Sequence, residues 1–184
     1  MKKLLIALTL ASAVMARAVV IDFDAVAAGP VTTIGDATFS LAGVGEGGAP
    51  VNASFSGVSY LWNSSDGAVY PTNTILRVDF ASLVSGVQWD FNNEGSKTTT
   101  TWTLLDASNL IIASGFNFPD SLIHTVDVSS YSGVKAIEWY NGGNNWLFGL
   151  NQLTYTSSVP DTGSTVALMG LALAAFGFMR RRIA

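Results

Sequence analysis

The chain has 184 residues, no cysteine and a formal net charge of −4. The absence of cysteine excludes disulfides, thiolate metal sites and a cysteine nucleophile. Charged residues make up only 12% of the chain, while 18 glycines are present, a composition that suits β-structure with many turns better than a disordered chain.

Most of the positive charge lies at the two ends of the chain. Residues 19–158 hold three basic and twelve acidic side chains, which gives this central body a net charge of −9. Such a body repels phosphate groups, so we expect no binding to nucleic acid.

Residues 1–18 have the pattern of a secretory signal peptide. Two lysines are followed by a short apolar stretch, and the sequence ARA ends at Ala18. The small-x-small pattern predicts cleavage after Ala18, with Ala13 as a second candidate position. We therefore expect an exported protein whose mature chain begins at Val19.

Residues 19–156 are predicted to form an all-β, antiparallel, jelly-roll-like sandwich. Apolar and polar side chains alternate over residues 76–80 and 87–91, which is the period of a half-buried strand. Turn-forming residues separate further short apolar stretches, and no helical periodicity interrupts them. The remaining expected strands cover residues 98–105, 111–113, 124–128, 134–140 and 146–156. We expect six to ten strands in this ectodomain.

The last part of the chain, residues 157–184, is predicted to be a sorting signal. Residues 166–179 carry no charge and are apolar on all sides of a helix, and three arginines, Arg180, Arg181 and Arg182, follow them. With Ser164 and Thr165 the helix 164–179 is long enough for a marginal membrane span. The arginines would stop it with the C-terminus in the cytoplasm.

A short motif precedes this helix: Val159, Pro160, Asp161, Thr162 and Gly163. Motif, apolar helix and arginine cluster together resemble the VPDSG variant of the PEP-CTERM signal, with Thr162 in place of serine. The body, from IDFDAVAAG to YSGVKAIEWYNGGNNWLFGLNQLTYT, is similar to the ectodomains that carry this signal. The resemblance implies processing by an exosortase, a transient hold in the inner membrane and release to the surface of a Gram-negative bacterium that makes extracellular polysaccharide and biofilm.

An alternative arises because the motif is also one residue from the Leu-Pro-x-Thr-Gly signal of Gram-positive sortase substrates. That system would attach Thr162 covalently to the cell wall. The simple signal peptide and the lack of a long spacer before Val159 favour the exosortase interpretation.

Two kinds of binding site are considered for the body. Asp22 and Asp24 in the first strand and Asn151 in the last are candidate ligands of a structural calcium ion, which prefers oxygen ligands. The alternative is that both aspartates face solvent on either side of Phe23. No cofactor other than this calcium is expected.

Aromatic residues near loop ends are candidates for stacking on sugar rings: Trp62, Tyr140 and Trp146. The other three tryptophans, Trp89, Trp102 and Trp139, lie at alternating apolar positions and are expected in the core.

Catalysis has no positive signal in the sequence, so we expect a protein that is not an enzyme. The only histidine, His124, shares a strand face with Val126 and Val128 and is expected at the margin of the core. No Gly-x-Ser-x-Gly motif occurs. Two of the three glutamates, Glu46, Glu94 and Glu138, could form a glycosidase pair if they stood about 5–9 Å apart across a cleft, which spacing along the chain does not show. The sequence thus favours a structural or polysaccharide-associated surface protein, with a carbohydrate-binding module as the alternative and a glycan hydrolase as a third hypothesis.

Overall fold

The computed structural model describes residues 16–43, 48–65, 73–93, 99–117, 122–140 and 147–157. Residues Arg17–Ser157 form one compact unit. Within the described ranges the chain is all-β with antiparallel pairing throughout, which confirms that part of the prediction. No helix in these ranges is long and apolar enough to cross a membrane. Residues 1–15 of the predicted signal peptide (1–18) and residues 158–184 of the predicted sorting signal (157–184) lie outside the described residues.

Within the described ranges, twelve strands and one 3₁₀ turn follow each other. They are β1 (Arg17–Asp22), η1 (Phe23–Ala25), β2 (Gly29–Pro30), β3 (Thr33–Ile34), β4 (Ala37–Gly43), β5 (Val51–Phe55), β6 (Val58–Trp62), β7 (Thr74–Asn93), β8 (Thr101–Leu105), β9 (Ile111–Phe116), β10 (Ile123–Asp127), β11 (Ser132–Tyr140) and β12 (Phe148–Ser157).

The longest strand, β7, joins the two alternating stretches that the sequence presents as separate strands. Its buried side chains include Val78 and Phe80 in the first half and Val87 and Trp89 in the second, so the alternation shifts by one position between the halves. The shift falls at Gly86, which has φ 62° and lies where β7 gains one residue relative to β12. A β-bulge at a glycine with positive φ produces this change of phase.

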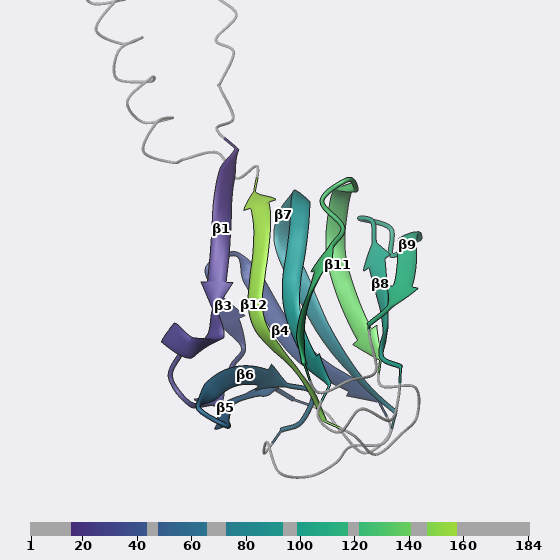
Figure 1. Ribbon diagram of the computed structural model, residues 1–184. Helices are drawn as coiled ribbons and strands as arrows, with labels where there is room; N and C mark the ends of the chain where they lie inside the picture. The colour runs from purple at the N-terminus through teal and green to yellow at the C-terminus, as the bar shows by residue number, and fades with distance from the viewer. Residues whose placement is uncertain are drawn as a thin grey trace, which may run out of the picture. The chain divides into compact units, whose positions relative to one another are not determined.

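The two halves of β7 belong to two layers. Thr74–Phe80 pairs with β4 on one side and β11 on the other, and β8 and β9 continue beyond β11. We call β4, the first half of β7, β11, β8 and β9 the β11 layer. The second half of β7 pairs with β12 and β10, and β1 and β6 pair with β12. In Figure 1, β7 runs between β12 and β11, with β1 and β9 at opposite sides of the view.

The core lies between the layers and is centred on aromatic rings. Trp89 of β7 packs edge-to-face against Trp102 of β8 at 5.6 Å and against Trp139 of β11 at 5.4 Å between ring centroids. Phe80 meets Tyr155 of β12 at 4.7 Å. All five residues are buried, so the expectation that these three tryptophans form core is confirmed.

Gly115 in β9 is the position at which the core is least able to accept a larger residue. A Cβ atom there would lie 2.4 Å from Cζ2 of Trp102. The indole is fixed against Trp89 and cannot move away without disturbing the core. We therefore expect Gly115→Ala to lower the free energy of unfolding by about 1–3 kcal/mol, the usual cost of overpacking.

Urea denaturation of the purified protein measures this loss. The matched control is Ser114→Ala, because Ser114 is the exposed neighbour in the same strand; it should change stability by less than about 0.5 kcal/mol. Equal midpoints for the two variants would contradict the placement of Trp102 over Gly115.

Candidate functional site

The outward side of the β11 layer carries two rows of side chains that cross its strands. Cross-strand pairing places the members of each row next to each other, and each row alternates with a row of core residues. What we call the aromatic row consists of Ala42, Ile75, Tyr140, Thr101 and Phe116. The polar row consists of Ser40, Arg77, Glu138, Thr103 and Ser114.

The core row between them fixes which way both rows face. Leu76, Trp139 and Trp102 are cross-strand neighbours of one another and are all buried. Since successive side chains of a strand point to opposite faces, the residues on either side of them point outward. The exposed fraction of Phe116 is 64%, which agrees with this direction.

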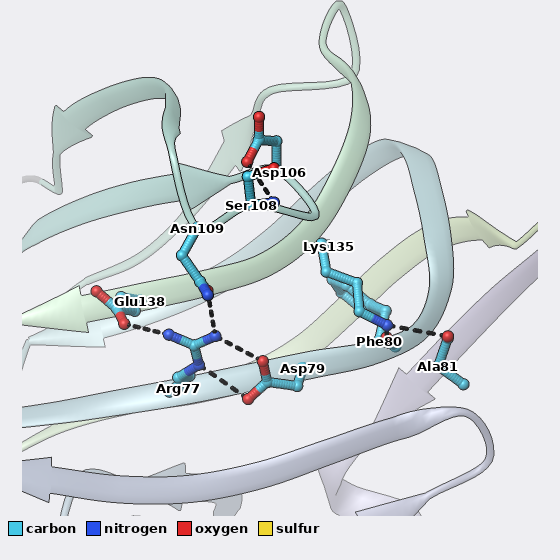
Figure 2. A network of polar contacts seen from close by, with 9 residues as sticks. All are labelled: Arg77, Asp79, Phe80, Ala81, Asp106, Ser108, Asn109, Lys135 and Glu138. Atoms are coloured by element: carbon cyan, nitrogen blue, oxygen red, sulfur yellow. Dashed lines mark hydrogen bonds and ion pairs between the residues drawn. The ribbon is translucent and has the colours of Figure 1, made fainter.

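Arg77 is the centre of a polar network on this face (Figure 2). Its guanidinium donates through Nε and Nη2 to the two carboxylate oxygens of Asp79, at 2.8 and 2.7 Å. Nη1 donates to Glu138 of β11 at 2.7 Å, and Nη2 also donates to Oδ1 of Asn109 at 3.0 Å. Hydrogen bonding to Asp79, and then to Glu138, raises the pKa of Arg77 above its usual value against the opposing effect of burial.

The turn between β8 and β9 is shaped to bring Asn109 to this network. The carboxylate of Asp106 accepts hydrogen bonds from the backbone N–H of Ser108 and Leu110, at 2.8 and 2.9 Å. Asn109 itself has φ 58°, a conformation that asparagine tolerates better than most residues. The network therefore ties β7, β11 and the β8–β9 turn together.

Lys135 of β11 stabilises the place where β7 bends away from the β11 layer. Its ammonium group donates to the carbonyl oxygens of Phe80 and Ala81, the latter at 2.9 Å. The pairing register between β11 and β7 shifts here. Val134 pairs with Val84 and Ala136 with Asp79, so the pairing passes over residues 80–83 of β7. Lys135 thus supplies hydrogen bonds to carbonyl groups in the stretch that the register skips (Figure 2).

Tyr140 and Phe116 are the two aromatic residues of the aromatic row, with Thr101 between them. Two strand spacings of about 4.8 Å separate their backbones by about 10 Å. The phenol of Tyr140 donates to Oδ1 of Asn73 at 2.8 Å, which fixes the ring against the start of β7. The outward side of this layer therefore offers two aromatic rings flanked by hydroxyl and amide groups.

Of the residues predicted for sugar stacking, only Tyr140 lies on this face. Trp62 has an exposed fraction of 2% and donates through Nε1 to the carbonyl oxygen of Ala53 at 3.0 Å. Its ring contacts Tyr60 and Phe55, at 5.0 and 6.2 Å between centroids. The prediction of Trp62 as an exposed stacking residue is corrected, because the β5–β6 hairpin and Leu147 enclose it in a small core of its own. Trp146 lies outside the described residues.

Phe116 was missed because the expected strand ended at Ala113. In the structure β9 continues to Phe116, and Gly115 within it leaves room for Trp102. The sequence held a signal for a longer strand, because Phe116 and Phe118 alternate with Asn117 before Pro119.

The structure brings two of the three candidate calcium ligands together. Asn151 Nδ2 lies 3.4 Å from Oδ2 of Asp24 and donates to the carbonyl oxygen of Ser59 at 3.0 Å. The other carboxylate oxygen of Asp24 accepts from the backbone N–H of Ser59 at 2.6 Å. Asp22 instead caps η1 by accepting from the N–H of Asp24. Protein donors thus already bind Asp24, and the described residues contain no group of three acidic, histidine or cysteine side chains that could hold a metal ion.

The two described residues weighed for catalysis, His124 and Glu138, lie on different strands. His124 is half-buried in β10, on the strand face that it shares with Val126 and Val128. Glu138 is paired with Arg77, and Glu46 and Glu94 lie outside the described residues. Among the described residues, the outward side of the β11 layer is the clearest candidate for binding.

Comparison with known proteins identifies the end of the chain. Residues 158–183 match the model of the VPDSG-CTERM motif. The chain ends in a PEP-CTERM-type sorting signal. This signal marks an exported protein that an exosortase-type system processes, and it covers the motif, the apolar stretch and the arginines predicted from the sequence. No curated protein matches the chain.

Several solved structures resemble the body weakly. A mutant of the second family 29 carbohydrate-binding module is 12% identical, with 77% of this chain and 93% of that chain covered, at a TM-score of 0.44. A further family 29 module is also 12% identical, covers 80% and 97%, and has a TM-score of 0.43. The lectin binding domain of lectinolysin, complexed with Lewis b, is 17% identical, covers 48% and 68%, and has a TM-score of 0.38. Likeness at this level transfers no ligand to this chain.

The Arg77 network generates a stability prediction. Arg77→Met leaves the carboxylates of Asp79 and Glu138 without their shared cation, so we expect the free energy of unfolding to fall by about 1–2 kcal/mol. Glu138→Gln keeps the guanidinium paired with Asp79 and should cost less than about 1 kcal/mol.

Thermal unfolding at low and high salt measures both variants. The difference in melting temperature between Arg77→Met and the parent should become smaller at 1 M salt, because the Debye length falls to about 3 Å and the ion pairs of Arg77 are screened. A melting temperature of Arg77→Met equal to that of the parent would show that the network contributes nothing.

Proposed function

We propose that this chain is a non-catalytic surface or matrix protein of a Gram-negative bacterium. Its jelly-roll-like ectodomain is released by an exosortase after a transient hold in the inner membrane and associates with extracellular polysaccharide. The observation that carries the proposal is the VPDSG-CTERM motif at residues 158–183. The motif's match to that model favours the exosortase interpretation over the sortase alternative.

The position of the motif relative to the fold supports this proposal. The last strand, β12, ends at Ser157, and the motif begins at Val159. A cut within Val159–Gly163 therefore removes no strand of the compact unit Arg17–Ser157. The protein remaining after the cut keeps every residue of the core.

The start of the fold is also compatible with removal of a signal peptide. β1 pairs with β12 from Arg17 opposite Ser157 to Asp22 opposite Gln152. Cleavage after Ala18 removes the first two residues of this strand, whereas cleavage after Ala13 retains the whole strand. Buried Ile21 and the other core residues stay in the mature chain in both cases.

The polysaccharide association is supported by the outward side of the β11 layer. Aromatic rings and hydroxyl groups are the side chains that bind sugar rings and their hydroxyls, and both occur there. A structural calcium at Asp22, Asp24 and Asn151 remains a prediction of the sequence. If the ion binds, EDTA should lower the melting temperature and added calcium should restore it, whereas an unchanged melting temperature would contradict the site.

The first test of the proposed function is the mass of the mature protein. Intact-mass analysis of protein from the extracellular fraction should give a C-terminus between Val159 and Gly163. Deletion of the host's exosortase should leave the chain ending at Ala184 in the membrane fraction. A released chain that still ends at Ala184 in the unmodified host would overturn the sorting proposal.

The second test is migration in native gels that contain the host's own extracellular polysaccharide. The purified mature protein should be retarded relative to a gel without the polymer, while an unrelated acidic protein of similar size should not be. Unchanged migration would leave a sorted surface protein without a glycan contact and would remove the polysaccharide part of the proposal.

A further inference from the structure

We propose that the outward side of the β11 layer is a binding site for a neutral, extended polysaccharide, with Phe116 and Tyr140 as its two stacking residues. The inference rests on the proposed association with polysaccharide and assigns it to one surface and one chemical class of polymer.

The spacing of the two rings is the first support. Phe116 and Tyr140 are separated only by Thr101 in the aromatic row, across two strand spacings, or about 10 Å. The row runs perpendicular to the strands, so a ligand that contacts both rings must cross β11, β8 and β9. An extended chain of sugar rings has the length and the flat apolar faces to do so, whereas one free monosaccharide cannot reach both rings.

The ring of Tyr140 and the backbone that carries Phe116 are held in place before a ligand arrives. Tyr140 donates to Asn73 at 2.8 Å, and its strand is cross-linked to β7 through Glu138 and Arg77. Phe116 follows Gly115, over which the fixed ring of Trp102 packs on the inner side. A site of this kind loses little conformational entropy on binding, which favours affinity.

Hydroxyl groups adjoin the rings on the same face. Thr101 lies between the two aromatic residues, and Thr103 and Ser114 form the neighbouring part of the polar row. Thr101 and Ser114 are exposed. Each hydroxyl is both donor and acceptor, which suits the hydroxyl groups of a neutral sugar.

The charges of this face determine the class of polymer. Arg77 donates to two carboxylates, those of Asp79 and Glu138, and Lys135 donates to backbone carbonyl groups. The described part of the β11 layer has no other basic side chain, and the body as a whole carries a net charge of −9. An acidic polymer such as a polyuronate would be repelled, so the site fits a neutral one.

The main rival occupant is a second copy of this chain. β9 is an edge strand that pairs only with β8 among the described residues. Its first residue, Ile111, is 68% exposed, and the preceding Leu110 is 65% exposed. Like net charges of −9 disfavour the approach of two copies, whereas a neutral glycan meets no such repulsion. The two occupants are separated by measuring the native mass.

The experiment uses affinity electrophoresis of the mature protein and of matched variants. The probes are hydroxyethylcellulose, alginate, and the host's polysaccharide separated by anion exchange into a neutral and an acidic fraction. Phe116→Ala and Tyr140→Ala test the site. The controls are Phe55→Ala and Tyr131→Ala, because these aromatic residues are 45% and 39% exposed but belong to β5 and to the β10–β11 turn.

The parent and both controls should be retarded by the neutral fraction of the host's polysaccharide and not by alginate or the acidic fraction. Each site variant should bind at least about tenfold more weakly, a loss of about 1.4 kcal/mol in binding free energy, because it removes one of the two stacking contacts. Melting curves that match the parent, together with Tyr140→Phe, which keeps the ring and should still bind, show that the loss is not due to unfolding.

Other outcomes overturn the inference in distinguishable ways. Retardation of the parent that neither site variant reduces removes the site but leaves the polysaccharide association intact. Retardation by the acidic fraction or alginate alone contradicts the assignment to a neutral polymer. A parent dimer that Phe116→Ala converts to monomer would make this face an interface between copies. If no probe retards the parent, the proposed association itself fails.

Discussion

The bend of β7 is the constraint on which the rest of the structure depends. One strand supplies the centre of both layers, so its direction has to change without breaking the ladders on either side. Gly86 provides the bulge that shifts the alternation of buried residues, and Lys135 supplies hydrogen bonds to carbonyl groups where β7 leaves β11. The backbone N–H of Ala81 donates to the carbonyl oxygen of Asp36 at 2.8 Å, which holds the same bend from the β3–β4 hairpin. Without such partners, a buried bend would leave polar backbone groups unsatisfied.

Two of the three basic side chains of the body lie at or near this strand and are used to stabilise it. Arg77 belongs to the first half of β7, and Lys135 lies on β11 next to the bend. Each makes several hydrogen bonds to the protein itself. Neither is held out toward solvent as an anion-binding group would be. Since the acidic side chains outnumber them across the body, the outward side of the β11 layer is rigid and carries no excess of positive charge. The ligand that we propose for this face would therefore be bound by stacking and hydrogen bonding.

The sequence predicted what depends on alternation and failed where the contact was not local. The stretches 76–80 and 87–91 were recognised as strands with the correct buried faces, because period-two patterns report a half-buried strand directly. That they form one strand depends on Gly86 and on partners in β11 and β12, which are far away in sequence. Trp62 was expected at the surface because it stands next to a loop, yet the β5–β6 hairpin and Leu147 bury it. Phe116 was overlooked because the role of Gly115 depends on Trp102 of the neighbouring strand.

Hydrogen bonds within the described body stabilise the end of the fold. The carboxylate of Asp36 accepts hydrogen bonds from the phenol of Tyr155 and, at 2.7 Å, from the hydroxyl of Ser157, the last residue of β12. Burial, together with the neighbouring Asp36, raises the pKa of Tyr155 well above its usual value, so the phenol stays a donor throughout the physiological range. Since the chain has no disulfide to fix its ends, these bonds and the β1–β12 ladder have to do so. The motif begins two residues later, at Val159, which allows processing to remove the tail while the interactions that close the domain stay in place.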